Sequence, residues 1–156
     1  MNRITKAIET ITNSFLVVFV VVLVASTTLQ VVSRFILKSP IIWTEEITRF
    51  CFIWMALLGA TLATRYKEHL GLDFTSSGEN NKLKVSLKVL VHFAMTASVV
   101  VFTAAGWFFV ERNFGRTSVT TGMPMVYLYI SAPVSGVIML YYLLEQIPSV
   151  LREWKQ

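Results

Sequence analysis

One stretch decides the fold of this chain: Ile41-Ile42-Trp43-Thr44-Glu45-Glu46-Ile47-Thr48-Arg49-Phe50, which runs directly into an apolar segment at residues 51–64. Thr44 is expected to cap a helix, because its hydroxyl can accept a hydrogen bond from a free amide at the helix start. Glu45 and Glu46 then fall in the first turn, where the helix dipole favours anions. The stretch therefore predicts a helix that begins at Thr44.

This helix is long enough to cross a membrane. As a helix, the 21 residues from 44 to 64 would be about 31 Å long, and the hydrocarbon core of a bilayer is about 30 Å thick. Arg49 follows Glu45 by four positions and Glu46 by three, so its guanidinium can fold back onto either carboxylate. We therefore expect a charge clamp at one membrane surface.

Small residues continue the face of Glu45 and Arg49 along the same helix. By helical spacing this face presents Phe52, Ala56, Gly59, Ala60 and Ala63. Small residues four positions apart let transmembrane helices approach closely, although such pairs also arise by chance on lipid-facing surfaces. We expect another helix to pack on this stripe, at Ala56, Gly59, Ala60 and Ala63.

The composition places the chain in a membrane. Of its 156 residues, 54% are hydrophobic and only 15% are charged, and the mean hydropathy is +0.62. In such a chain a net charge of +5 records orientation across the membrane, so no nucleic-acid partner is expected. The single Cys51 can form neither an internal disulfide nor a cysteine cluster, and we expect a small packed side chain there.

Three more apolar stretches complete the pattern. Spans are expected at about residues 14–34, 44–64, 88–110 and 126–144, within a single domain that covers residues 1–156. A cleaved signal peptide is the alternative for the first span, but the apolar run there continues to Val32. The chain is therefore expected to be an all-α integral membrane protein with four transmembrane helices.

Polar and small residues inside the spans predict further helix contacts. Gln30 lies on a polar stripe of the first span, and Ala132 and Gly136 form a small-residue pair in the fourth. Pro133 removes a backbone hydrogen bond in the middle of the fourth span, which predicts a kink. The hydroxyl of Ser131 or Ser135 could satisfy the backbone group that is freed.

Basic residues predict the orientation. The side that holds both termini and the middle loop carries two Lys and Arg at the N-terminus, five in the loop and two in the tail, against five on the opposite side. By the positive-inside rule, both termini are expected in the cytoplasm. Lys82, Lys84 and Lys88 are interleaved with leucines and predict a basic turn on the membrane surface, with a solvated loop as the alternative.

The spans carry few groups that could do chemistry. His92 is the one titratable side chain well inside a charge-free span, and we expect a hydrogen-bonded histidine at a helix interface. A haem with two axial histidines would need a second one in a span, whereas His69 lies in the middle loop. His69 and Asp73 alone do not make a metal site. We therefore expect an accessory membrane subunit without catalytic, metal-binding or substrate-binding residues, and no enzyme.

Several motifs along the chain form a set. They are Ser33-Arg34-Phe35, Ser39-Pro40, Trp43-x-Glu45-Glu46-x-x-Arg49-Phe50, Leu58-Gly59-Ala60 and Arg65-x-x-Glu68-His69-x-x-x-Asp73-Phe74, with the later stretch 118–124 and Pro133. Over essentially the whole length, this set resembles the DctQ-type small membrane subunit of TRAP transporters, the tripartite ATP-independent periplasmic carriers. The first two spans carry the most specific part of the resemblance.

The resemblance implies a scaffold subunit that pairs with a large membrane subunit in the bacterial inner (cytoplasmic) membrane. A periplasmic binding protein would deliver an organic acid, and the coupling sodium ions would bind to the large subunit, so no cofactor is expected here. The stretch 39–73 looks closest to sialic-acid members. Besides membrane lipids, the partner or the periplasm would be contacted by Arg34, Trp43, Glu45, Glu46, Arg49 and Arg116. The alternative is a membrane anchor of a redox complex, which would show a Soret absorption band.

Overall fold

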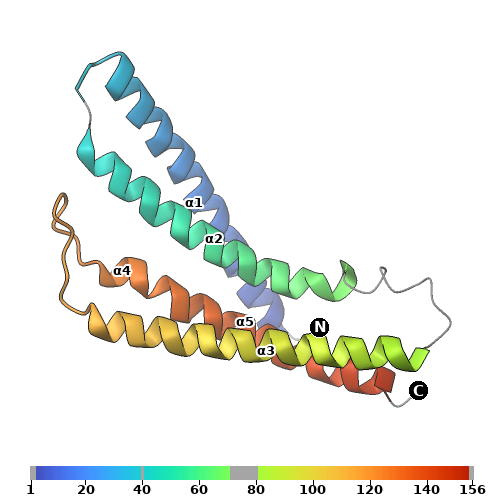
Figure 1. Ribbon diagram of the computed structural model, residues 1–156. Helices are drawn as coiled ribbons and strands as arrows, with labels where there is room; N and C mark the ends of the chain where they lie inside the picture. The colour runs from blue at the N-terminus through green and yellow to red at the C-terminus, as the bar shows by residue number, and fades with distance from the viewer. Residues whose placement is uncertain (1–2, 40, 71–80, 155–156) are drawn as a thin grey trace. The chain divides into compact units, whose positions relative to one another are not determined.

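The computed structural model describes residues 3–39, 41–70 and 81–154. Within these ranges the chain forms five helices, and the only extended pairing is an isolated antiparallel bridge between Thr117 and Pro124. In chain order (Figure 1), the helices are α1 (Arg3–Phe35), α2 (Ile42–Leu70), α3 (Asn81–Arg112), α4 (Val126–Tyr129) and α5 (Ser131–Trp154).

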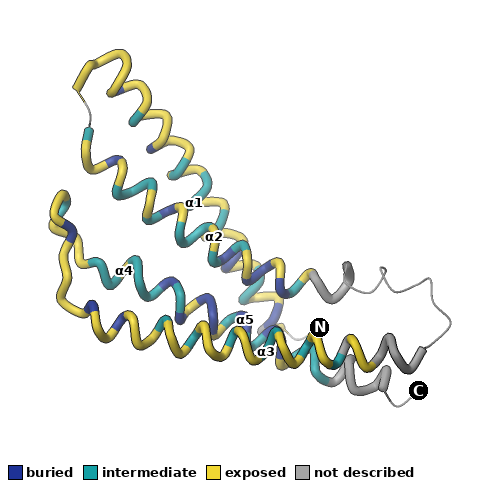
Figure 2. The backbone as a smooth tube through the Cα atoms, in the orientation of Figure 1, coloured by how far each residue is buried: buried dark blue, intermediate teal, exposed yellow. Residues whose placement is uncertain are grey.

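Four segments of the described chain are long and apolar enough to cross a membrane. They are Thr5–Phe35, Ile42–Tyr66, Val89–Arg112 and Val126–Ile147. The prediction of an all-α protein with four spans is therefore confirmed. Figure 2 shows exposed residues along most of α1 and α3, and many of them are large and apolar. Such surfaces suit lipid tails or partner helices and would be unfavourable in water.

The helices belong to two compact units. One comprises Met1–Gly59 with Phe109–Ser131, and the other comprises Ala60–Phe108 with Ala132–Gln156. We call them the first and the second unit and describe each by itself. The single four-helix domain that the sequence predicts stays a prediction.

In the first unit, aromatic side chains pack α1 against α2. The ring of Phe19 stacks on Trp54 with 5.8 Å between centroids and meets Phe50 edge-on at 6.2 Å. The indole N–H of Trp54 donates a hydrogen bond to the carbonyl of Tyr127 at 3.0 Å. Because Tyr127 belongs to α4, this bond ties α2 to the start of the fourth span.

The start of α2 differs from the prediction. The helix begins at Ile42, and Thr44 already lies in its first turn. The hydroxyl of Thr44 is buried and donates to the carbonyl of Ile41 at 2.6 Å, so it does not accept from an amide. The predicted N-cap at Thr44 was wrong, because inside the first turn a preceding carbonyl is the acceptor within reach.

The fourth span is interrupted at Ile130, between α4 and α5, and the kink expected at Pro133 stays a prediction. Pro133 lies one turn further on and has no N–H to donate toward the carbonyl of Tyr129. The hydroxyl of Ser131 donates to the carbonyl of Leu128 at 2.6 Å and not to that of Tyr129. The buried hydroxyl of Ser135 has no hydrogen-bond partner in the described part of the chain, so neither serine satisfies the freed carbonyl as predicted.

In the second unit, α3 and α5 approach closely where small residues meet. A Cβ atom placed on Gly106 would lie 3.1 Å from the Cβ of Ala132. One placed on Gly136, which is buried, would lie 3.0 Å from the Cβ and 3.3 Å from the Cα of Thr103. These distances leave no room for a larger side chain, so the contact depends on glycine.

A polar contact joins α2 to α5 in the same unit. Nη1 of Arg65 lies 3.6 Å from Oε2 of Glu145, and its guanidinium carbon lies 5.2 Å from the centre of the Tyr142 ring. Gln146 also donates from Nε2 to the carbonyl of Thr64 at 3.3 Å. The charges at the ends of these two spans are thus neutralised within the unit.

Candidate functional site

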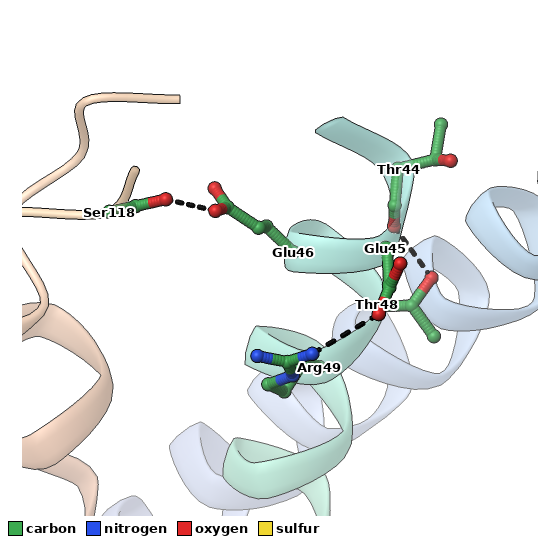
Figure 3. A network of polar contacts seen from close by, with 6 residues as sticks. All are labelled: Thr44, Glu45, Glu46, Thr48, Arg49 and Ser118. Atoms are coloured by element: carbon green, nitrogen blue, oxygen red, sulfur yellow. Dashed lines mark hydrogen bonds and ion pairs between the residues drawn. The ribbon is translucent and has the colours of Figure 1, made fainter. Parts of the chain in front are cut away.

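Glu45 and Glu46, the two carboxylates at the start of α2, contact different partners. Nη2 of Arg49 lies 3.2 Å from Oε1 of Glu45, which is the ion pair that the spacing predicts. Both side chains are 60% exposed, and solvent weakens such a pair. Figure 3 shows that Glu46 turns the other way, toward Ser118. The clamp therefore holds one carboxylate and not both.

Glu46 is held by hydroxyls from a distant segment. Ser118 and Thr121 each donate a hydrogen bond to one of its carboxylate oxygens. Ser118 is buried and Glu46 is half-buried, so this contact is better shielded than the ion pair beside it. It fastens the segment before α4 to the first turns of α2.

The hydroxyls are presented by a tight hairpin at residues 116–125. The N–H of Ser118 donates to the carbonyl of Met123 at 2.8 Å, and the N–H of Met125 donates to the carbonyl of Arg116 at 2.9 Å. Gly122 has a φ of +70°, a conformation that favours glycine over residues with a Cβ. Val119 at the tip is fully exposed. We call residues 116–125 the pinned hairpin.

A cavity of about 190 Å³ lies between the first turns of α2 and the segment that leads into α4. Apolar side chains make up most of its wall, and Glu46 and Arg49 supply the two charged groups. We call it the surface cavity, because it lies where the spans Ile42–Tyr66 and Val126–Ile147 both begin. Its main apolar residues are Ile47, Phe50, Met123, Met125 and Leu128.

The other residues predicted for an interface are exposed. Arg34, Trp43 and Arg116 all lie open to the surroundings. Arg34 also lines a second cavity together with Gln30 and Glu45. The structure therefore brings Arg34 and Glu45 to one cavity and Glu46 and Arg49 to another, and their role toward a partner stays a prediction.

Most of the predicted small-residue stripe is uncovered. Ala56, Ala60 and Ala63 are exposed, while Gly59 is half-buried and a Cβ placed there would lie 3.9 Å from Cδ1 of Leu16. The close helix contact expected at the three alanines therefore stays a prediction. Ala132 and Gly136, in contrast, lie at the contact between α3 and α5 described above.

Two predictions concern α3. Lys82, Lys84 and Lys88 fall within its bounds, but their side chains lie outside the described residues, so their contact with the membrane surface stays a prediction. Nε2 of His92 is buried without a hydrogen-bond partner among the described residues, contrary to our expectation. The nearby hydroxyl of Thr96 donates instead to the backbone carbonyl of His92 at 2.8 Å.

These features define a class. The described residues contain no group of three or more His, Cys, Asp or Glu that could hold a metal ion. The charged groups in the described contacts between segments lie near the ends of the apolar spans. The chain is therefore a small multi-pass membrane protein whose charged side chains lie near the ends of its spans.

The family follows from the sequence. The family model described as "Tripartite ATP-independent periplasmic transporters, DctQ component" matches residues 23–153. The chain belongs to this family, a component of transporters. The resemblance found in the motifs is thereby confirmed.

Two curated relatives are similar over most of this chain. The sialic acid TRAP transporter small permease protein SiaQ of Vibrio cholerae is 28% identical over 152 residues, which covers 97% of this chain and 88% of that protein. The sialic acid TRAP transporter permease protein SiaT of Haemophilus influenzae is 24% identical over 149 residues. That match covers 93% of this chain but only 23% of the longer permease.

The pinned hairpin gives a first testable prediction. Replacing Ser118 and Thr121 together by alanine should remove two hydroxyl donors from the half-buried Glu46 carboxylate, so the hairpin should open more often. We expect amide hydrogen exchange at residues 117–125 to become about ten-fold faster in the double variant. Arg49→Ala is the matched control and should change these rates less than about two-fold, because its ion pair is exposed. Equal acceleration of hydrogen exchange in both variants would contradict the conclusion that the hydroxyl contacts to Glu46, and not the Glu45–Arg49 ion pair, hold the hairpin.

Proposed function

We propose that this chain is the small scaffold subunit of a TRAP transporter and that it pairs with a large membrane permease. The observation that carries the proposal is the exposed stripe of Ala56, Ala60 and Ala63, which is shaped for close contact with a helix of another chain. The charged residues of α2 lie near its ends, at Glu45, Glu46 and Arg49 and at Arg65, Lys67 and Glu68, and none lies at mid-span. A span of this kind offers helix contact and no ion path.

The longer relative supports the pairing. The match to SiaT spans nearly all of this chain and less than a quarter of that permease. A stretch similar to this chain is therefore covalently joined there to a much larger permease chain. Two segments that act within one polypeptide in one system are good candidates for a non-covalent pair in another.

The names of the same relatives support a proposal for the substrate. Both have names that specify sialic acid, so we propose an organic acid of the acidic-sugar type as the transported solute. The sodium ions that drive uptake would bind to the large permease, and a periplasmic binding protein would deliver the solute. The complex would lie in the inner membrane, and this subunit would carry out no catalysis. The alternative of a redox anchor gains no support from the described residues.

Copurification tests the pairing. An affinity-tagged copy of the full chain, extracted from its native membranes in mild detergent, should recover a large multi-span permease that mass spectrometry identifies. The double variant Ala56→Leu with Ala60→Leu should lower this recovery about ten-fold, because bulky side chains prevent close helix contact. Ala104→Leu, at an exposed alanine of α3, should leave recovery unchanged. Recovery of no permease by the unaltered chain would refute the proposal, and equal recovery by all variants would refute this face as the interface.

The proposed orientation has a test of its own. With Cys51 replaced by alanine, a single cysteine at Val119 should react with a membrane-impermeant thiol reagent in intact cells, since the tip of the pinned hairpin is fully exposed. Val119 is a better reporter than Ser118, which is buried. A cysteine at Ser77, in the polar connection after α2, should be protected if the positive-inside rule holds. The reverse pattern would place the termini in the periplasm.

A further inference from the structure

The surface cavity combines an apolar wall with one cation and one anion. Ile47, Phe50 and Leu128 contribute to the wall, while Arg49 and Glu46 carry the two charges. We propose that this cavity binds a zwitterionic phospholipid with a primary ammonium headgroup. The phosphate would lie on Arg49, the ammonium would face Glu46, and the upper part of one acyl chain would enter the cavity.

The size and wall of the cavity suit part of an acyl chain. An apolar cavity of about 150 Å³ is large enough to take up benzene, and the surface cavity measures about 190 Å³. Met123, Met125 and Leu128 add flexible apolar side chains that adapt to a chain without fixed shape. The cavity therefore has room for several methylene groups and for little more.

The depth of the cavity matches the headgroup region. The cavity includes residues close to the first positions of two spans, which begin at Ile42 and Val126. Tyr127 and Tyr129 also line it, and tyrosine is typical of the boundary between lipid tails and headgroups. A phospholipid at this level would keep its headgroup beside the charged residues while its tail points into the bilayer.

Arg49 has free donors for a ligand, and Glu46 offers a negative charge. A guanidinium offers five N–H donors, and Arg49 uses one for Glu45 within the described residues. Its planar fork matches two phosphate oxygens. The Glu46 carboxylate already accepts hydrogen bonds from Ser118, Thr121 and Thr120, so an ammonium would meet its negative charge and not a free acceptor position. Opposite charges side by side fit a zwitterion better than an anionic headgroup, which Glu46 would repel.

Photolabelling tests the proposal. The full chain is placed in nanodiscs with a phosphatidylethanolamine that carries a diazirine near the start of one acyl chain, and labelled residues are mapped by mass spectrometry. We expect labelling of Met125 and Leu128 to exceed that of Val101, a 67% exposed residue of α3, by about five-fold. Leu128→Trp, which fills the cavity, should lower labelling of Met125 to the level of Val101. Met123→Trp provides a second filling variant, should Leu128→Trp fail to fold.

A second comparison isolates the headgroup. A diacylglycerol probe with the same photoreactive chain lacks the phosphate and the ammonium, so the ratio of the two labelling yields at Met125 reports headgroup recognition. Arg49→Gln should lower this ratio about five-fold, whereas Arg116→Gln, at an exposed arginine outside the cavity, should not change it. Cavity labelling no stronger than at Val101, or an unchanged ratio in Arg49→Gln, would overturn the proposal. Loss of the label when a large permease is bound would do so too, because the cavity would then be a protein interface.

Discussion

Gly136→Leu is expected to be among the most destabilising single substitutions in the second unit. The residue is buried, and a Cβ atom there would already lie 3.0 Å from the Cβ and 3.3 Å from the Cα of Thr103. A leucine would force α3 and α5 apart, since one of the crowded atoms belongs to the backbone. We expect the midpoint of thermal unfolding in detergent to fall by about 5 to 10 °C, or the yield of folded protein to collapse.

Ala104→Leu is the matched control for this experiment. Ala104 lies on α3 next to Thr103 but is exposed, so a larger side chain there meets lipid or detergent. Its unfolding midpoint should stay within about 2 °C of the unaltered chain. A midpoint for Gly136→Leu equal to that of the control would show that α3 and α5 do not pack through this contact.

The four spans could be predicted because their signals are local. Apolar length decides whether a segment can cross a bilayer, and helical spacing decides that Glu45 and Arg49 can meet. The interruption near Pro133 is local in the same sense, because proline always lacks its N–H. Such features depend on residues within one or two turns, which the sequence shows directly.

The contacts that hold distant segments together could not be predicted in this way. Glu46 and Ser118 are 72 positions apart, and Thr64 and Gln146 are 82 apart. No helical spacing links residues so distant, and many Ser and Thr could have served as donors. One signal was available, since Arg49 can neutralise only one of two adjacent carboxylates and the other must find a partner elsewhere.

The small-residue contacts could be predicted only in part. The spacing of Ala132 and Gly136 predicts that a helix packs there, but does not identify it as α3 at Thr103 and Gly106. The same spacing at Ala56, Ala60 and Ala63 leads to a face that remains exposed. Spacing shows that a surface can accept a helix, and only the three-dimensional arrangement shows whether this chain supplies that helix.

The prediction with the largest effect is that this chain alone transports nothing. Its spans carry their charged residues near the membrane surfaces, so a solute or an ion would find no charged side chain halfway across. The large permease would supply the transport site, and this subunit would supply packing surface. The isolated chain should therefore show no uptake, and uptake should appear only when its partners are present.

Uptake into reconstituted vesicles tests this central claim most directly. Radiolabelled sialic acid is supplied outside under an inward sodium gradient, to vesicles that hold the chain alone, the copurified permease complex with a binding protein, or no protein. The scaffold function predicts that the chain alone equals empty vesicles and that the complete system accumulates the solute. Sodium-dependent uptake by the chain alone would contradict it and would make this small protein a carrier in its own right.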